Sequence, residues 1–328
     1  ERTASSRDVS SLLAAGAAET RQLAGIRRES GRGRVPTIVL GGFVPDSGEQ
    51  VFLLRTSLLQ AGDLHAVTYP RDGFSLELLC AQLDDLAASL ARRNETPVLF
   101  GVSFGAGVLL EWLRRRRAAG TELPIAGLVL VSPVTCVADV VPPGAVKPAT
   151  LIGRALRPIL EAAGAPSEPA VERARLIFTR MFEAGAQNKA ALARLMTAKE
   201  LGRLHGAVLG TIRGLTARGA AERVRAFGAM RAPTEYFSPA ALPLSSAPAL
   251  VLFAEREDAI MDPAAPSLLA FGRAVAAYFP EGAALEVRAR PGDSPVQHAS
   301  LVFHAHEFLP PLRAFYGRLR APALPLAA

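Results

Sequence analysis

Lysine, cysteine and long apolar runs are scarce in this sequence of 328 residues. Only three of its 37 basic residues are lysine, so arginine carries nearly all of the positive charge. Together with the abundant alanine, this bias is typical of a GC-rich genome, and we do not read the basic composition as a sign of nucleic-acid binding. The sequence has no basic stretch interleaved with aromatic residues and no zinc-finger or helix-turn-helix pattern, so we expect no nucleic-acid partner.

The two cysteines, Cys80 and Cys136, are too few for the disulfide framework of a secreted protein. We expect both to be free, buried thiols, which favours a reducing and hence cytoplasmic location. No segment approaches the roughly 18 consecutive apolar residues of a membrane-spanning helix, so no transmembrane segment is predicted. The sequence starts with Glu1 instead of methionine, which leaves a processed or truncated start open.

Short apolar runs alternate with helical patterns along most of the chain. Strands are predicted over residues 37–40, 64–69, 97–102, 125–131, 249–253 and 285–290. Helices are predicted over residues 76–90, 104–117 and 301–319. Buried strands that alternate with helices indicate an α/β fold, with a mostly parallel central sheet covered by helices on both faces.

Three parts of the chain differ in pattern. Residues 1–36 are predicted to form an N-terminal arm with a weak helix over residues 8–27, and residues 37–139 and 247–328 the α/β core. Residues 140–246 have several helical stretches and no strand signal, which indicates an inserted helical cap because structureless loops of that length are uncommon. This cap has 15 basic and 7 acidic residues, so its charge of +8 exceeds the net +7 of the whole chain.

A G-x-S-x-G pattern, Gly101–Gly105, lies between the predicted strand 97–102 and the helix that follows it. This strand–turn–helix context is that of a nucleophile elbow, in which a serine is held out on a sharp turn. The turn is so tight that side chains at Gly101 and Gly105 would collide across it, and we expect Ser103 to have a strained backbone. The positive end of the following helix favours an anion there. The pattern therefore predicts Ser103 as a nucleophile.

A serine hydroxyl needs a base to become a nucleophile, and the chain has five histidines. His65 lies in a predicted strand, His205 in the cap, and His304 and His306 in the last helix. His298 lies in a loop just before that helix, where a base can reach the turn at the end of a strand, so we predict it as the base and keep His304 as the alternative. The stretch His-Ala-His-Glu lacks the spacing of an HExxH site, and we expect no metal.

The base in turn needs a carboxylate to orient it, and several acidic residues follow the strand at 249–253. We choose Asp258, although Glu255, Glu257 and Asp262 lie close to it in the sequence. Asp139, which follows the strand at 125–131, is an alternative acid from a different part of the sheet.

A tetrahedral oxyanion also needs hydrogen-bond donors, and the glycines after the strand at 37–40 let the backbone approach a substrate closely. The backbone N–H of Phe43, or that of Gly42, is predicted to act together with the N–H of Phe104.

These residues together resemble the α/β-hydrolase superfamily, over residues 37–131 and 248–319. The order Ser103, Asp258, His298 is that family's order of nucleophile, acid and base, and an insertion at this point forms a cap over the active site in that family. The chain departs from the family at Leu40, where most members have histidine, and at Ala254, where the acidic turn normally starts with glycine. No cofactor is expected.

The resemblance implies an esterase or thioesterase that works through an acyl-enzyme on a small-molecule substrate. Two other interpretations stay open: an acyltransferase that uses the same residues, and a catalytically silent binding protein of this fold. Apolar residues at helical spacing in the cap either pack it onto the core or line a tunnel for an acyl chain. The charge of the cap suggests attraction of an anionic substrate, such as an acyl-CoA or a carboxylate, or of an anionic membrane surface. The sequence does not indicate an oligomeric state.

Overall fold

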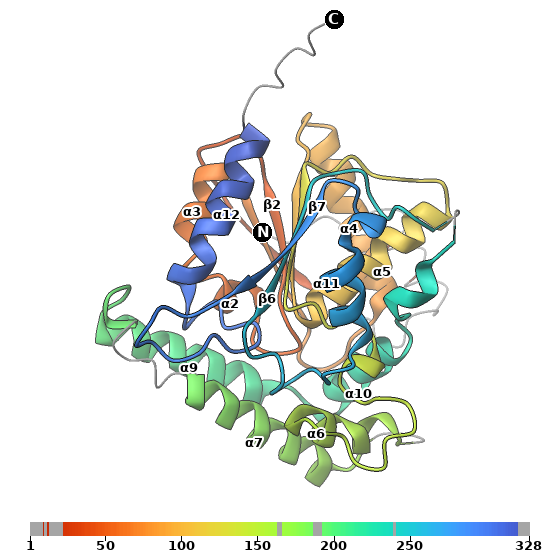
Figure 1. The fold of residues 1–328 in the computed structure, drawn as a ribbon, viewed down its shortest axis with the longest axis vertical. Coiled ribbons are helices and arrows are strands. Elements are labelled where there is room, and N and C mark those ends of the chain that lie inside the picture. The colour runs from red at the N-terminus through yellow and green to blue at the C-terminus, as the bar shows by residue number, and fades with distance from the viewer. Residues whose placement is uncertain are drawn as a thin grey trace, which may run out of the picture.

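A sheet of seven strands runs through the centre of the computed structural model (Figure 1). The structure describes residues 9, 12, 22–162, 166–185, 192–238 and 241–320. The strand order is β1-β3-β2-β4-β5-β6-β7, in which β1 and β3 are antiparallel and all other neighbours are parallel. The strands are β1 (Gly25–Glu29), β2 (Thr37–Leu40), β3 (Leu64–Thr68), β4 (Val98–Val102), β5 (Gly127–Val131), β6 (Ala249–Ala254) and β7 (Gly282–Val287).

The central strands β2, β4, β5 and β6 are buried along their whole length, which is why each is a continuous apolar run in the sequence. Their side chains alternate between two cores, one on each face of the sheet. Leu99 and Leu130 belong to the first core, and their neighbours Phe100 and Val131 to the second.

Helices cover both faces of the sheet (Figure 1). The first face carries α4 (Leu76–Ala91), α5 (Phe104–Ala118) and α11 (Pro266–Tyr278), and the second carries α3 (Arg55–Ala61) and α12 (Ala305–Arg320). Leu83 of α4 and Trp112 of α5 pack in the first core, while Leu58 of α3 and Phe308 of α12 pack in the second. The predicted α/β class, with a mostly parallel sheet between two helical layers, is confirmed.

The edges of the sheet differ from the prediction. Gly25–Glu29 form the edge strand β1, although a helix is predicted as far as residue 27; the other residues of that predicted helix, apart from 9, 12 and 22–24, lie outside the described chain. The strand predicted at 285–290 is β7 at 282–287. Both edge strands are partly exposed, so they lack the continuous apolar run of the central strands. The helices α2 (Ser47–Gln50), α3 and α11 are not predicted from the sequence.

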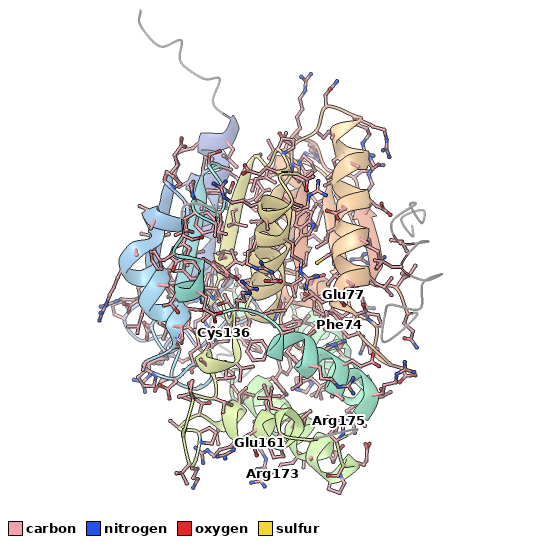
Figure 2. All side chains as sticks on the ribbon, turned by 90° about the vertical axis from the view of Figure 1, so that its right-hand side faces the viewer. Phe74, Glu77, Cys136, Glu161, Arg173 and Arg175 are labelled. Atoms are coloured by element: carbon pink, nitrogen blue, oxygen red, sulfur yellow. The ribbon has the colours of Figure 1, made fainter. Side chains whose placement is uncertain are left out.

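Between β5 and β6 the described chain is helical. After the short turn η1 (Val137–Asp139), it forms α6 (Leu151–Leu160), α7 (Glu168–Gly185), α9 (Ala198–Gly214), α10 (Ala217–Gly228) and the turn η2 (Pro233–Tyr236). In Figure 2, Phe74 and Cys136 lie at the boundary between the sheet layers and these helices, whereas Glu161 and Arg173 lie on their far side. The helices α6 to α10 therefore form a separate layer below the sheet, which we call the cap.

Both cysteines, Cys80 and Cys136, are free and buried, as predicted. Burial raises the pKa of each thiol to about 12, so both stay protonated at neutral pH. None of the helices in the described part of the chain is both long enough and apolar enough to span a bilayer.

Candidate active site

Ser103 lies on the sharp turn between β4 and α5, with a backbone φ of 50° and ψ of −118°. A Cβ atom at Gly101 would lie 2.6 Å from Cα of Ala106, and one at Gly105 would lie 2.3 Å from the carbonyl oxygen of Gly41. These two positions therefore accept only glycine without displacing backbone. The Ser103 N–H donates to the Val131 carbonyl at 2.9 Å, which fixes the strained residue to the end of β5.

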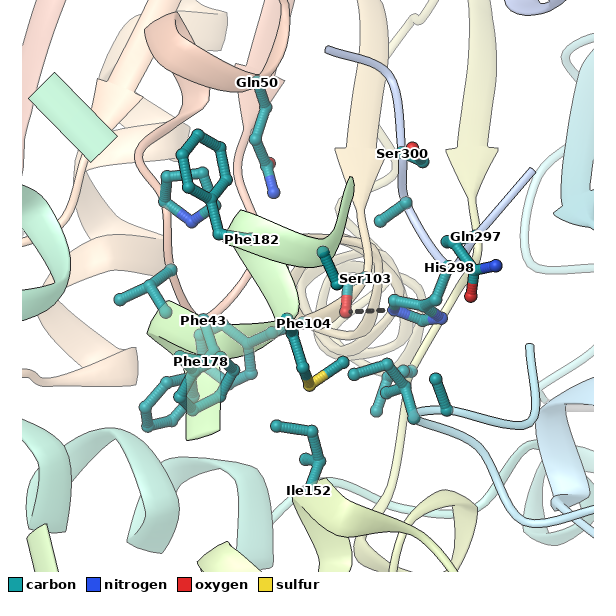
Figure 3. A pocket seen from close by; sticks show the side chains of 18 of the residues that line it. Phe43, Gln50, Ser103, Phe104, Ile152, Phe178, Phe182, Gln297, His298 and Ser300 are labelled. Carbon is teal, nitrogen blue, oxygen red and sulfur yellow. Dashed lines mark hydrogen bonds between the residues drawn. The ribbon is translucent and has the colours of Figure 1, made fainter. Parts of the chain in front are cut away.

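The His298 ring approaches Ser103 from the loop before α12. Its Nε2 lies 2.9 Å from the Ser103 Oγ, within hydrogen-bond reach (Figure 3). Two backbone contacts hold this loop at the ends of the central strands: the Arg256 N–H donates to the Val296 carbonyl at 3.1 Å, and the Ala299 N–H donates to the Ser132 hydroxyl at 2.9 Å. The structure thus brings together the predicted nucleophile and the predicted base, which are 195 residues apart in the sequence.

The carboxylate next to His298 belongs to Glu257, not to the predicted Asp258. Glu257 Oε2 hydrogen-bonds the His298 Nδ1, and its Oε1 accepts from the Ala254 N–H at 2.7 Å. Both side chains of the Glu257–His298 pair are buried. The Asp258 side chain is 62% exposed and faces Arg256 at 3.5 Å, because the turn after β6 directs it away from the site. The choice of Asp258 as the residue that orients His298 is therefore corrected to its neighbour.

The alternative acid, Asp139, has other partners. Its buried carboxylate accepts hydrogen bonds from the backbone N–H groups of Thr135 and Cys136 and from both the N–H and the hydroxyl of Ser267. Burial raises its pKa, whereas these hydrogen bonds lower it. Asp139 thereby ties the end of β5 to the start of α11, and no hydrogen bond to His298 is found for it among the described residues.

Both ring nitrogens of the alternative base, His304, have hydrogen-bond partners other than Ser103. Its Nε2 donates to the Ser294 carbonyl at 2.9 Å, and its Nδ1 accepts from the Ser300 hydroxyl at 2.7 Å. Burial lowers its pKa, so it stays neutral. Because Ser294 and Ser300 flank His298, the His304 ring braces the loop that carries the predicted base.

The predicted oxyanion loop, Gly41–Phe43, is held by side chains on several sides. The Tyr69 hydroxyl donates to the Gly41 carbonyl at 3.0 Å, and the Gly42 N–H donates to Gln50 Oε1 at 2.8 Å. The guanidinium of Arg223 donates to the Phe43 carbonyl. Gly42 N–H is thus already used, whereas no hydrogen bond to the N–H of Phe43 or of Phe104 is found within the described ranges.

A cavity of about 460 Å³ opens in front of Ser103 (Figure 3). The cap closes one side of it with apolar side chains, which include those of Ile152, Phe178, Met181, Phe182 and Phe227. Polar lining residues gather around the loop that carries His298, among them Ser294, Gln297, Ser300 and His304. Of the described residues that line the cavity, none is Arg, Lys, Asp or Glu.

One cluster of potential metal ligands exists outside this cavity. The side-chain ligand atoms of Asp293, His306 and Glu307 lie within 4.8 Å of one another. However, Nε of Arg290 lies 3.0 Å from Glu307 Oε1 and already balances this carboxylate. Arg290 therefore already supplies one positive charge to the described part of this cluster.

Comparison with known proteins identifies the family of the fold. A profile described as the alpha/beta hydrolase family matches residues 41–321. A search of curated proteins found no match.

Three solved structures illustrate the similarity in fold. A putative aryl esterase from Burkholderia cenocepacia is 17% identical, with a TM-score of 0.56 over 90% of this chain and 94% of that one. An esterase from Rhodococcus sp. is 21% identical, with a TM-score of 0.53 over 90% and 96% of the two chains. A thermophilic esterase from Thermogutta terrifontis is 16% identical, with a TM-score of 0.52 over 91% and 95%. The profile covers most of the sequence, so the chain belongs to the alpha/beta hydrolase family.

Proposed function

We propose that this protein is a serine hydrolase that cleaves carboxylic esters or thioesters through an acyl-enzyme. The observation that carries the proposal is the continuous hydrogen-bonded chain from Glu257 through His298 to Ser103, with the serine facing the cavity. A serine, an imidazole and a carboxylate in this order form the arrangement of covalent acyl transfer.

In the proposed reaction, His298 Nε2 takes the proton of the Ser103 hydroxyl as Oγ attacks the substrate carbonyl. Glu257 holds the proton on Nδ1 and stabilises the imidazolium that forms. The tetrahedral intermediate collapses when the imidazolium gives its proton to the leaving alcohol or thiol, and the acyl group stays on Ser103. In the second half of the reaction, water attacks the acyl carbonyl while His298 takes one of its protons. The imidazolium then returns this proton to Ser103 Oγ, which releases the acid and restores the hydroxyl.

The oxyanion of the intermediate is proposed to accept hydrogen bonds from the backbone N–H groups of Phe43 and Phe104. The local structure makes each N–H group a candidate donor. Phe104 is the first residue of α5, whose first N–H groups have no partner within the helix, and Phe43 lies in the loop after the strand β2. Gly42 is the weaker candidate, because its N–H already donates to Gln50.

The lining of the cavity favours an uncharged, apolar acyl group. The volume of the cavity, about 460 Å³, falls within the range of small-molecule sites. Apolar and aromatic cap residues would remove the acyl chain from water, at about 25 cal/mol for each Å² buried. An anionic acyl group would instead lose its hydration without meeting an arginine or lysine among the described lining residues. The predicted preference for anions is therefore not part of this proposal.

Labelling of the nucleophile, a series of substrates and added acceptor alcohols test the proposal. A fluorophosphonate probe should label the wild-type protein, and Ser103→Ala should abolish both labelling and turnover. A series of p-nitrophenyl esters from acetyl to octanoyl should be hydrolysed faster than a succinyl half-ester of matched length, and acyl-CoA thioesters would show whether thioesters are accepted. Turnover that survives in Ser103→Ala, or a wild-type protein that the probe does not label, would refute the mechanism.

Added methanol or glycerol should not divert the acyl group into a new ester; efficient diversion would favour the acyltransferase.

A further inference from the structure

Arg223 is a buried cation in the cap that does not face the cavity. It lies on α10 and is 1% exposed, among the most buried of the large side chains. Burial lowers its pKa to about 10, so it is still protonated at neutral pH. A buried cation is strongly unfavourable unless polar groups replace its hydration, so its partners identify what it holds in place.

Those partners are backbone carbonyls at the carboxyl ends of the strands. One guanidinium nitrogen donates to the Phe43 carbonyl. The other donates to the Pro70 carbonyl at 2.9 Å and reaches the Tyr69 carbonyl at 3.5 Å. The guanidinium carbon also lies 5.4 Å from the centre of the Tyr69 ring and 5.8 Å from that of Phe43, within the range of a cation–π contact. Arg223 therefore holds both the carbonyl and the ring of Phe43.

The helix that carries Arg223 is itself firmly attached to the core. The Thr216 N–H donates to the Arg71 carbonyl at 3.0 Å, and Glu222 accepts from the Phe74 N–H at 2.7 Å. A Cβ atom at Gly219 would lie 2.1 Å from the Arg71 carbonyl oxygen, so helix and loop are in direct backbone contact. Figure 2 shows Phe74 directly at this boundary. The helix α10, from which the Arg223 side chain extends, is thus held in a fixed position on the core.

A second set of contacts joins the cap to the same loop. The Thr211 hydroxyl of α9 donates to Glu49 at 2.7 Å, and Arg71 pairs with Asp46 at 2.9 Å while also reaching Thr211 at 3.1 Å. Glu49 and Asp46 cap the short helix α2, whose last residue, Gln50, holds the Gly42 N–H. The cap thereby holds the oxyanion loop from two sides.

From these contacts we infer that Arg223 is a positioning residue: by holding the carbonyl and the ring of Phe43 it fixes the Cα of that residue and thereby aims the adjoining Phe43 N–H at the oxyanion, so that catalysis depends on a correctly seated cap. The inference rests on the proposed ester hydrolysis at Ser103. If the Phe43 carbonyl moved away, a further guanidinium N–H would be left buried and unsatisfied, in addition to that of Nε. The Gly42–Phe43 peptide, which carries the Phe43 N–H, therefore lies between two held points: the Gly42 N–H on Gln50 and the Phe43 carbonyl on Arg223. Misdirecting a donor that acts mainly on the tetrahedral intermediate should lower kcat and leave KM nearly unchanged.

The test compares Arg223→Met and Arg223→Lys with Arg225→Met as the matched control. Arg225 lies on the same helix but is exposed, whereas Arg218 pairs with Glu222, which helps to attach the helix to the core. Fluorophosphonate titration counts correctly folded sites, so kcat is expressed per site. We expect Arg223→Met to lower kcat about 10- to 100-fold, less than the loss of a whole oxyanion donor, with KM within about three-fold. The lysine variant should be intermediate, because an ammonium cannot bridge the same set of carbonyls.

A readout that needs no turnover is amide hydrogen exchange. The peptide covering residues 41–46 should exchange faster in Arg223→Met than in the wild type, while peptides of β4 and α12 should not change. A variant with wild-type kcat per site and unchanged exchange would overturn the inference. A wild-type protein that is inactive on every ester would instead refute the proposed function, and exchange in residues 41–46 would still decide whether Arg223 holds this loop.

Discussion

Replacing Glu257 by glutamine tests the corrected acid most directly, because the structure fixes how the new amide would be oriented. Glu257 Oε1 accepts from the Ala254 N–H at 2.7 Å. In Glu257→Gln the amide oxygen should keep this bond, which turns the amide nitrogen toward His298 Nδ1. The ring must then accept at Nδ1 and carry its proton on Nε2, where it can no longer take the proton of Ser103. The substitution thus selects the wrong tautomer and also removes the charge that stabilises the imidazolium.

The expected loss follows from Coulomb's law. A carboxylate about 4 Å from the imidazolium, at an effective dielectric constant of about 20, stabilises it by about 4 kcal/mol. At about 1.4 kcal/mol for each factor of ten, this corresponds to a loss in kcat of about 10³-fold, and the wrong tautomer adds to it. Asp258→Asn is the matched control: its side chain is 62% exposed, so the change should stay within about two-fold.

The assay is the hydrolysis of a p-nitrophenyl ester, with kcat expressed per site that fluorophosphonate titrates under prolonged exposure. A circular dichroism melt verifies that both variants are folded. The reasoning is refuted if Glu257→Gln stays within about five-fold of the wild type, or if Asp258→Asn is the variant that loses activity.

Three further changes test other parts of the structure. Gly105→Ala should prevent folding or abolish activity, because its Cβ would lie 2.3 Å from the Gly41 carbonyl oxygen, whereas Gly202→Ala, with no atom within 4 Å, should be neutral or stabilising in a thermal melt. Burial lowers the pKa of His65 to about 4, below the 6.5 of an unfolded histidine. The contribution of neutral His65 to the free energy of unfolding is therefore complete above pH 6.5 and is lost as the pH falls toward 4. Urea unfolding at pH 7 and pH 4 should show a fall in stability that is smaller in His65→Leu by about 3 kcal/mol; an equal fall in both would contradict it. Ile152→Trp should lower kcat/KM for octanoyl esters at least about ten-fold and spare acetyl esters, because Ile152 lines the cap side of the cavity; equal losses on both would argue against an acyl pocket there.

The central sheet and the position of Ser103 could be predicted because both are local consequences of sequence. Strands buried on both faces need continuous apolar residues, and the sharp turn at Ser103 needs glycine at position 101, where a Cβ would collide with Ala106. Glycine at position 105 is needed instead by the close approach of Gly41, a contact from another strand that the G-x-S-x-G pattern records without explaining. The edge strand β1 has no such signature: only Ile26 is buried, and Arg27 and Arg28 are exposed. A short, half-exposed strand of this kind forms because it pairs with β3, and a local sequence pattern does not show this long-range pairing.

The carboxylate that contacts His298 could not be predicted, for a different reason. Glu257 and Asp258 are adjacent, and either carboxylate suits the chemistry. The choice depends on the path of the turn after β6, where the Ala254 N–H captures Glu257 and the Met261 N–H donates to the Glu257 carbonyl at 2.8 Å. These contacts bury Glu257 and turn Asp258 outward. A comparison of side-chain length offers the one local signal: the longer glutamate can bond Ala254 and still reach His298.

The charge of the cap shows how a net property of the sequence can mislead about a site. Residues on α7 divide by helical periodicity: Phe178, Met181 and Phe182 line the cavity, while Arg173 and Arg180 are exposed. Figure 2 shows Arg173 among the cap helices, away from the sheet. A sum of charges over the segment mixes these two faces. Screening limits the field of the outer arginines to about 10 Å, so under the proposed function they would act only on the approach of a substrate. Selection at the carbonyl would depend instead on the groups that replace water around it, and the described lining residues of the cavity include no Arg, Lys, Asp or Glu.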